Sequence, residues 1–250
     1  MKDWLYDLRT AVAFLTRLPM PHPHGAAPAN FTQAVRLFPL VGAAIGGSIG
    51  LFCVALRAAG MPALAAAALA IGAGALLTGA LHEDGLADVA DGFGGGKDRS
   101  AKLEIMRDSR LGTYGTLILL VAFSAKVSAI AAVRDDVVVR ALIAAHALSR
   151  AVLPFMSLTV GYARKDGLAA TAGRPDLSTA ATAGGIALII TFLALRWPVA
   201  LAAVLIAAAC ALGMSWLARR QIGGLTGDVL GATQQVGETA ILLLLATLTR

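Results

Sequence analysis

Apolar stretches of membrane-spanning length alternate with short polar segments along most of the chain. Seven stretches are apolar enough to be considered as spans, at about residues 37–56, 61–81, 113–133, 137–160, 180–195, 198–217 and 229–248. The fifth is short, and the seventh contains Gln234, Gln235 and Glu238. The pattern predicts an all-α fold: a polytopic integral membrane helical bundle with about seven transmembrane helices.

The first residues of the chain have a different pattern. Apolar side chains occupy positions 4, 5, 8, 11, 12, 15 and 18, which is the spacing of one helix face. We therefore expect an N-terminal amphipathic helix that lies at the membrane interface and ends at Pro19. Asp3, Asp7 and Arg9 interrupt the segment, so it does not have the unbroken apolar region of a signal peptide.

Composition and charge support a bilayer environment. Hydrophobic residues make up 58% of the chain and charged residues 14%, whereas soluble domains have about 25% charged residues. A soluble domain of this composition would lack the polar surface to cover its core, and a disordered chain would be far less apolar. The net charge of +6 would suit nucleic acid in a soluble protein. Here we attribute it to cytoplasmic loops, and we expect no nucleic-acid partner.

The distribution of Lys and Arg predicts the orientation in the membrane. With seven spans and the N-terminus inside, 14 of these residues fall in cytoplasmic segments and five outside. This bias predicts a cytoplasmic N-terminus. As a consequence, the loops 82–112, 161–179 and 218–228 should all open on the cytoplasmic side.

The first of these loops contains a dense acidic motif. Seven of the 15 acidic residues fall between positions 83 and 108. Asp84, Asp88 and Asp91 are spaced i, i+4, i+7, so their carboxylates would project from one face of a helix. Carboxylates placed in this way repel one another unless a cation offsets them, and hard oxygen ligands suit Mg²⁺ or Mn²⁺. We favour a metal site over the alternative, a solvated polar face at a helix end.

Two segments after the motif bear on phosphate binding. The glycine-rich run at 92–96 lacks the residues of a Walker A loop, and we interpret it as a flexible hinge. Arg107 and Arg110 have the chemistry to bind phosphate oxygens bidentately, although they also fit a positive cluster before the next span. Carboxylates and cations together at one membrane edge are what metal-assisted phosphoryl transfer needs.

Some charged residues have two open interpretations. Lys126, Arg150 and Glu238 fall at membrane depth, where an unpaired charge costs about 2.5–3.5 kcal/mol, so mutual pairing inside the bundle is the structural alternative to a functional role. Asp228 opens the last span after a glycine-rich loop. It is either a fourth carboxylate of the acidic site or a helix N-cap, and the sequence does not choose between the two.

Several of these segments together resemble the cobalamin synthase family, also called adenosylcobinamide-GDP ribazoletransferases. The matching segments, in order, are FLTRLP at 14–19, FPLVG at 38–42, H-x-D-G-L-A-D-x-x-D-G at 82–92, IMRDSRLGTYG at 105–115, Ser149-Arg150, and GGLTGDVLGATQQVGE at 223–238. The acidic motif and IMRDSRLGT are specific, whereas the apolar spans are not. The loop around Arg174-Pro175-Asp176 is only a loose equivalent of the family's loop.

The resemblance implies a late step of vitamin B12 assembly. In this family, adenosylcobinamide-GDP condenses with α-ribazole or its 5′-phosphate, GMP leaves, and adenosylcobalamin or its 5′-phosphate forms. The resemblance also implies Mg²⁺ as cofactor and the bacterial inner membrane as location. Residues 1–250 would then be a single integral membrane catalytic domain, and we also consider association with other enzymes of the corrinoid pathway.

On this basis we assign roles to the site residues. Asp84, Asp88 and Asp91 are expected to hold Mg²⁺ against the diphosphate, and Arg107 and Arg110 to bind its oxygens. A ribose hydroxyl of the ribazole would attack the phosphorus on the cobinamide side. The base for that hydroxyl stays open between the three motif aspartates, Asp108, Asp228 and His82. The further residues expected to contact substrate are His82, Arg150 and Glu238.

Two other functions are weighed against this one. A CDP-alcohol phosphotransferase also has an acidic D-G motif at a membrane edge, but its pattern requires Ala-Arg soon after the first D-G, which is absent here. A transporter would use Lys126, Arg150 and Glu238 as its path. Transporters place such residues near mid-membrane, whereas most acidic residues here fall in one loop.

Overall fold

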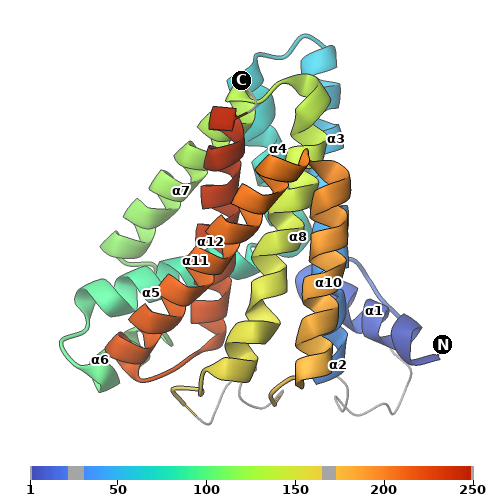
Figure 1. Ribbon diagram of the computed structural model, residues 1–250. Coiled ribbons are helices and arrows are strands. Elements are labelled where there is room, and N and C mark those ends of the chain that lie inside the picture. Colours follow the sequence, from blue (N-terminus) through green and yellow to red (C-terminus); the bar gives the residue numbers. More distant parts are fainter. Residues whose placement is uncertain (1, 22–30, 165–172, 249–250) are drawn as a thin grey trace.

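The computed structural model describes residues 2–21, 31–164 and 173–248, and this part of the chain is built from helices (Figure 1). The helices are α1 (Lys2–Leu15), α2 (Phe31–Ala34), the 3-10 helix η1 (Val35–Leu37), α3 (Phe38–Ala58), α4 (Ala63–Thr78), α5 (Leu81–Gly95), α6 (Arg99–Ile105), α7 (Thr113–Ala132), α8 (Asp135–Thr159), α10 (Leu177–Ala194), α11 (Trp197–Ile222) and α12 (Gly227–Leu248). No strand occurs among the described residues, which have one isolated bridge, between Tyr162 and Leu225. The all-α prediction is confirmed.

Six helical segments are long and apolar enough to cross a membrane, namely residues 31–58, 113–132, 135–159, 177–194, 197–222 and 227–248. A seventh is possible if α4 and α5 are counted as one broken span, since they meet at an angle of 94°. The protein is thus a polytopic helical membrane bundle with six or seven spans. Each of these segments overlaps a predicted one, so the prediction of about seven spans is confirmed.

The break between α4 and α5 was not predicted. The predicted span ran to residue 81, but α4 ends at Thr78, where Gly79 has φ +67° and Ala80 has φ +54°. Two successive residues in the left-handed region redirect the chain, and glycine adopts this region without strain. Figure 1 shows that α5 consequently runs across the long axis of the bundle rather than along it.

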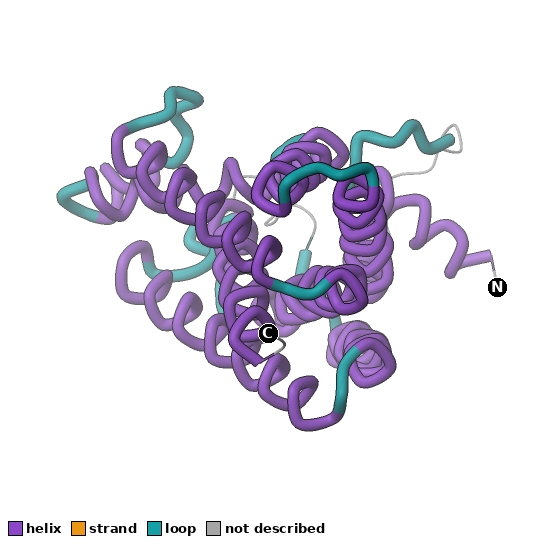
Figure 2. Tube along the Cα trace, turned by 90° about the horizontal axis from the view of Figure 1, so that it is seen from above, coloured by secondary structure: helices purple, strands orange, loops and turns teal. Residues whose placement is uncertain are grey.

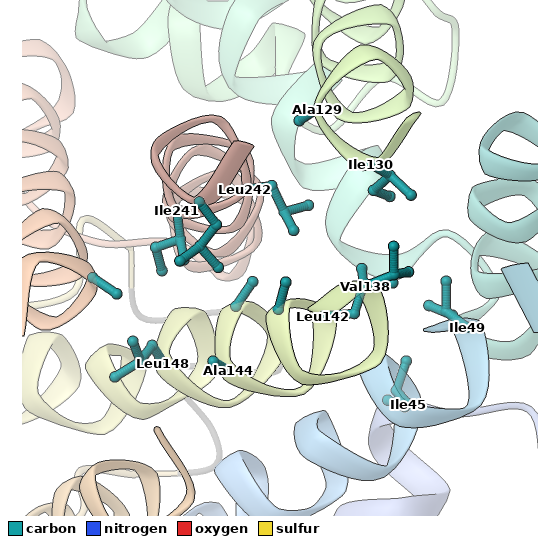
Figure 3. Packing of buried hydrophobic residues seen from close by; sticks show 14 of the residues in the cluster. Ile45, Ile49, Ala129, Ile130, Val138, Leu142, Ala144, Leu148, Ile241 and Leu242 are labelled. Carbon is teal, nitrogen blue, oxygen red and sulfur yellow. The ribbon is translucent and has the colours of Figure 1, made fainter. Parts of the chain in front are cut away.

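The core is formed where α3, α7, α8 and α12 pack together. Ile45 and Ile49 of α3 face Val138 and Leu142 of α8 in Figure 3, and α7 and α12 complete the cluster. Gly42, Gly46 and Gly50 of α3 bring its backbone close to α8. A Cβ on Gly50 would lie 2.8 Å from the Cα of Val139. Small residues therefore supply close helix contact here, as expected for packing in a bilayer.

The predicted N-terminal amphipathic helix is confirmed as α1, which Figures 1 and 2 show beside the bundle, but it ends at Leu15 and not at Pro19. Its place at the membrane interface stays a prediction. The helix leaves Trp4 exposed and buries Leu15. The buried Asp7 carboxylate pairs with Arg36 of η1 at 2.5 Å, and the Arg36 guanidinium also lies 3.9 Å from the centre of the Trp4 ring. These contacts attach α1 to the beginning of the first span.

The loops expected on one side of the membrane meet at one end of the bundle, opposite the C-terminus (Figure 1). Leu225 donates a hydrogen bond to Gly161 O, and Ala163 donates one to Leu225 O, both at 2.8 Å. Arg99 of α6 donates to Ile222 O and to Ala163 O. We call this end the acidic end. Part of the loop 161–179, residues 165–172, lies outside the described residues.

The hinge interpretation of the glycine-rich run is wrong. Residues 92–95 continue α5, which ends only at Gly95. These glycines serve close packing instead: a Cβ on Gly94 would lie 2.7 Å from the Tyr114 ring, and one on Gly92 would lie 2.5 Å from the Met106 side chain. The α5 backbone therefore lies against α7 and the end of α6, and this packing keeps the run helical.

Candidate functional site

The acidic motif lies on a helix, as the spacing predicts. Asp84, Asp88 and Asp91 all belong to α5. The bend after α4 places them at the acidic end instead of within a span. Gly85 permits contact with α12, because a Cβ there would lie 2.8 Å from Asp228 O. The start of α12 is thus pressed against the first turns of α5.

A cavity of about 320 Å³ opens at this contact. Its polar lining includes His82 and Asp84 from α5, Asp228 from α12, and Arg164 from the segment after α8. Asp228 and Arg164 form an ion pair at 3.3 Å, and both side chains are partly exposed. The structure therefore brings together two acidic residues separated by more than 140 positions, together with one cation.

The carboxylates around this cavity are electrostatically coupled. Asp88 is half-buried, and its carboxylate interacts with the charges of Asp84, Asp228 and Asp91, and with that of Arg164. The Arg164 guanidinium is thus a compensating charge for both Asp88 and Asp228. Such an excess of negative charge in partly buried surroundings is unfavourable unless a cation or a proton offsets it.

Asp228 is not needed as the cap of α12. The side-chain oxygen of Thr226, the residue before the helix, accepts a hydrogen bond from the Val229 N–H at 3.2 Å. Thr226 therefore occupies the N-cap position with the usual cap geometry. Of the two interpretations of Asp228, the position in the cavity favours the functional one.

Asp91 differs from the other two motif aspartates. Its two carboxylate oxygens accept the backbone N–H groups of Gly112 at 2.8 Å and of Gly115 at 2.9 Å. These are otherwise unsatisfied donors at the N-terminus of α7, where a negative charge is stabilised. Asp91 is only 9% exposed and does not line the cavity. Its contacts are those of a residue that holds α7 against α5.

The donors at the cavity fit a hard divalent cation in part. No group of three or more His, Cys, Asp or Glu side chains in the described part of the chain converges closely enough to hold a metal ion by itself. Mg²⁺, however, is commonly bound by one or two carboxylates, with the remaining positions taken by water and substrate phosphates. Asp84 lines the cavity, and Asp88, one helical turn further along α5 and outside the cavity lining, supplies a second carboxylate of this kind.

Arg107, Asp108 and Arg110 lie in the turn between α6 and α7, and none of them lines the cavity. Asp108 accepts hydrogen bonds from the Arg110 side chain, which is 88% exposed. These hydrogen bonds lower the pKa of Asp108 to about 2. Its carboxylate is therefore ionised and weakly basic at neutral pH. The assignment of Arg107 and Arg110 to phosphate binding remains a prediction.

The charges at membrane depth pair with one another. Glu238 lies 3.3 Å from Lys126, 3.2 Å from His146 and 3.6 Å from Arg150. Gln234 donates a further hydrogen bond to Glu238 at 2.6 Å. Arg150 is 2% exposed and Glu238 3%, and neither lines the large cavity. The structural alternative, mutual pairing, describes this cluster, and a substrate contact from either residue remains a prediction.

This buried cluster extends to the acidic helix. Gln235 donates a hydrogen bond to Glu83 at 3.0 Å, and Lys126 lies 3.9 Å from the same carboxylate. A small cavity of about 20 Å³ lies among these groups, and His82 lines both this cavity and the large one. The predicted site residue His82 is therefore at the boundary between the two.

Sequence reasoning missed Arg164 and Glu83. Arg164 entered the sequence interpretation only as one positive charge of a cytoplasmic loop, yet it pairs with Asp228 in the cavity. Glu83 stands beside Asp84 in the motif but reaches the buried cluster. Neither role has a local signal, because both depend on partners more than 40 residues away.

The fold and the site define a polytopic helical membrane protein with a carboxylate-lined cavity at one end of its bundle. The chain matches the cobalamin-5-phosphate synthase family over residues 7–246 and belongs to that family. It is therefore a transferase of cobalamin biosynthesis, which confirms the resemblance seen in the sequence. The transporter and CDP-alcohol phosphotransferase alternatives are wrong.

Relatives named adenosylcobinamide-GDP ribazoletransferase are similar over nearly the whole chain. That of Bradyrhizobium diazoefficiens is 44% identical over 98% of this chain and 95% of its own length. That of Sinorhizobium medicae is 41% identical over 98% of both chains. That of Rhizobium etli is 42% identical over 99% of this chain and 98% of its own. No solved structure matches the chain.

Proposed function

We propose that this protein joins adenosylcobinamide-GDP to α-ribazole, or to α-ribazole 5′-phosphate, with release of GMP, in the cavity at the acidic end of the bundle. Family membership and the names of the relatives support the reaction. The observation that carries the assignment to this cavity is the meeting of Asp84 from α5, Asp228 from α12 and Arg164. Carboxylates and a guanidinium at one membrane edge suit a diphosphate substrate and a hydroxyl nucleophile.

Asp84 and Asp88 are the residues that would hold Mg²⁺. They are oxygen donors one helical turn apart, and the substrate diphosphate would supply further ligands. When bound, the ion would neutralise the diphosphate oxygens and the charge that develops on the leaving group. Asp91 is left out of this set because its oxygens accept the N–H groups at the start of α7.

Asp228 is the base that we assign to the ribose hydroxyl. It lines the cavity, it comes from a different helix than the metal pair, and Thr226 relieves it of capping. As the hydroxyl oxygen forms its bond to the phosphorus on the cobinamide side, the hydroxyl proton passes to the Asp228 carboxylate. The bond from this phosphorus to the GMP oxygen breaks, and GMP leaves with the electron pair. Arg164, at 3.3 Å from Asp228, is placed to bind a phosphate oxygen during this step.

The location we propose is the bacterial inner membrane, with the acidic end in the cytoplasm. The positive charge of the segments at this end supports the orientation. Association with other enzymes of the corrinoid pathway would then use the same cytoplasmic end.

An activity assay tests the proposed function. The full-length protein, purified into nanodiscs, is incubated with adenosylcobinamide-GDP and α-ribazole, and GMP release and corrinoid product are followed with Mg²⁺ and after chelation by EDTA. We expect GMP and product in equal amounts, and loss of both on chelation. Absence of product with both forms of ribazole would refute the reaction, and turnover unaffected by chelation would refute the metal assignment.

A further inference from the structure

The large cavity has two chemically different linings. His82, Asp84, Arg164 and Asp228 supply polar and charged groups, whereas three phenylalanines come from the N-terminal part of the chain. These are Phe14 of α1, Phe31 of α2 and Phe38 of α3. An anionic substrate alone would require only the charged groups. The aromatic residues therefore call for a ligand that also has an apolar part.

The three phenylalanine rings form one continuous aromatic wall. Phe14 and Phe38 are stacked, with ring centroids 5.6 Å apart and planes 9° from parallel. The Phe31 ring stands edge-on to both, at 4.8 Å from Phe14 and 6.0 Å from Phe38. Rings that pack on one another have few rotamers to lose, so this wall is a preorganised surface for a flat apolar group.

The size of the cavity limits which part of the substrates it can enclose. A volume of about 320 Å³ is at the lower end of the range for small-molecule pockets, about 300–1,000 Å³. It suits a nucleoside, whereas a corrin ring with its side chains would have to remain largely outside. The proposed reaction brings two nucleosides to the reacting phosphates, the guanosine of the leaving GMP and α-ribazole. The apolar bicyclic base of α-ribazole fits the aromatic lining better than guanine, whose amide and amino groups would lose their hydrogen bonds there.

We propose that the aromatic wall of Phe14, Phe31 and Phe38 binds the benzimidazole base of α-ribazole, and that the ribose then lies toward Asp228 and Arg164. The assignment rests on the proposed function and makes the three phenylalanines determinants of base specificity. An apolar base gains free energy on leaving water, and it stacks favourably on the face of an aromatic ring. Replacing a phenylalanine removes that face. The ribose and any 5′-phosphate require the polar lining on the α5 and α12 side.

The N-terminal helix acquires a role in the site through Phe14. Asp7 and Trp4 of α1 both contact Arg36, which follows Phe31 by five positions and precedes Phe38 by two. These contacts fix α1 to the segment that supplies the other two rings. An interfacial helix that only attached the protein to the membrane would need neither the buried ion pair nor an aromatic side chain in the cavity.

The test uses the full-length protein in nanodiscs with Phe31→Leu and Phe14→Leu. Phe155→Leu is the matched control, because Phe155 follows the cavity residues Leu153 and Pro154 on α8 but contacts Gly184 of α10 instead. For the wall variants we expect the KM for α-ribazole to rise about tenfold, while kcat and the KM for adenosylcobinamide-GDP change less than about twofold. The control should retain wild-type values for both substrates.

A second readout separates base contact from a general structural effect. The wild type should prefer α-ribazole over an α-riboside with a single-ring base, and the wall variants should lose most of this preference in kcat/KM. Equal losses for both ribosides, or a KM increase confined to adenosylcobinamide-GDP, would overturn the inference. If Phe14→Leu does not fold, Phe31→Leu and the wild-type preference decide the question.

The failure of the inference can be distinguished from that of the proposed function. A wild type that turns over both substrates, with Phe31→Leu indistinguishable from it, refutes the aromatic subsite alone. A wild type without turnover refutes the reaction. Calorimetric titration of the wild type with α-ribazole then shows whether the wall binds the base in the absence of chemistry, and no detectable binding would overturn the subsite as well.

Discussion

Replacing Asp228 by Asn tests the carboxylate of α12 with almost no change in shape. The side chain lines the cavity and pairs with Arg164 at 3.3 Å. Asn retains the size and one oxygen but accepts no proton from a ribose hydroxyl at neutral pH. We therefore expect kcat to fall at least about tenfold, which corresponds to a barrier increase of roughly 1.4 kcal/mol.

The effect on stability should be small by comparison. Loss of a partly exposed ion pair typically costs about 0.2–1 kcal/mol, and the α12 cap is unaffected because Thr226 provides it. The thermal unfolding midpoint of the variant in nanodiscs should therefore stay close to that of the wild type, while GMP release falls. A lower kcat with an unchanged unfolding midpoint would show that Asp228 takes part in the reaction.

Asp176→Asn is the matched control. Asp176 is an exposed aspartate directly before α10, and its side chain accepts the Thr179 N–H at 2.7 Å. Because Asn caps a helix about as well as Asp, this variant should show unchanged kcat and unchanged stability. Asp228→Asn with wild-type kcat and wild-type Mg²⁺ dependence would refute our reasoning and return Asp228 to a structural role.

Three further predictions follow from the same contacts. Asp88→Asn should abolish GMP release with an unchanged unfolding midpoint. Asp91→Asn should instead lower the unfolding free energy by about 1–3 kcal/mol, because an amide N–H₂ would face backbone donors. A stability defect in Asp88→Asn and a purely kinetic defect in Asp91→Asn would contradict the site. Lys126→Met should destabilise the bundle by about 3 kcal/mol or more, because Glu238 loses a buried partner. Lys126→Arg should retain part of that stability. A Met variant that melts like the wild type would show that the pair contributes little. Single cysteines at positions 97 and 135, in a background without native cysteines, should react with impermeant reagents from opposite sides of the membrane, position 97 from the cytoplasm. Labelling of both positions from the same side would refute the orientation.

The sequence predicts the spans well because their signal is local. Length and apolarity decide whether a segment crosses a bilayer, and the described helices follow the predicted spans within a few residues at most ends. The amphipathic helix α1 is predictable for the same reason, since its apolar positions recur at helical spacing. The i, i+4, i+7 spacing of the acidic motif likewise predicts its helix before any contact is known.

Most of the missed features depend on contacts between segments that are apart in the sequence. The glycine-rich run at 92–95 would favour a flexible hinge in isolation, but packing against Tyr114 and Met106 makes it helical. The left-handed residues Gly79 and Ala80 redirect α5, and no local pattern marks a left-handed alanine. Spacing alone does not distinguish the three motif aspartates, whereas in the structure the Asp91 oxygens accept hydrogen bonds from the start of α7.

The direction of α5 explains why Glu83 and Asp84, adjacent in the motif, lie in two different environments. Successive residues of a helix point about 100° apart, so a helix lying across the bundle end can direct one side chain inward and the next outward. Glu83 reaches Gln235 and approaches Lys126 in the buried cluster, while Asp84 lines the cavity. Had α5 continued along the axis of α4, both carboxylates would lie at membrane depth, where each needs a compensating charge. The turn at Gly79 and Ala80 instead lets the partly buried Glu83 fix the helix, because its partners lie on α7 and α12. The adjacent Asp84 is left free to meet substrate.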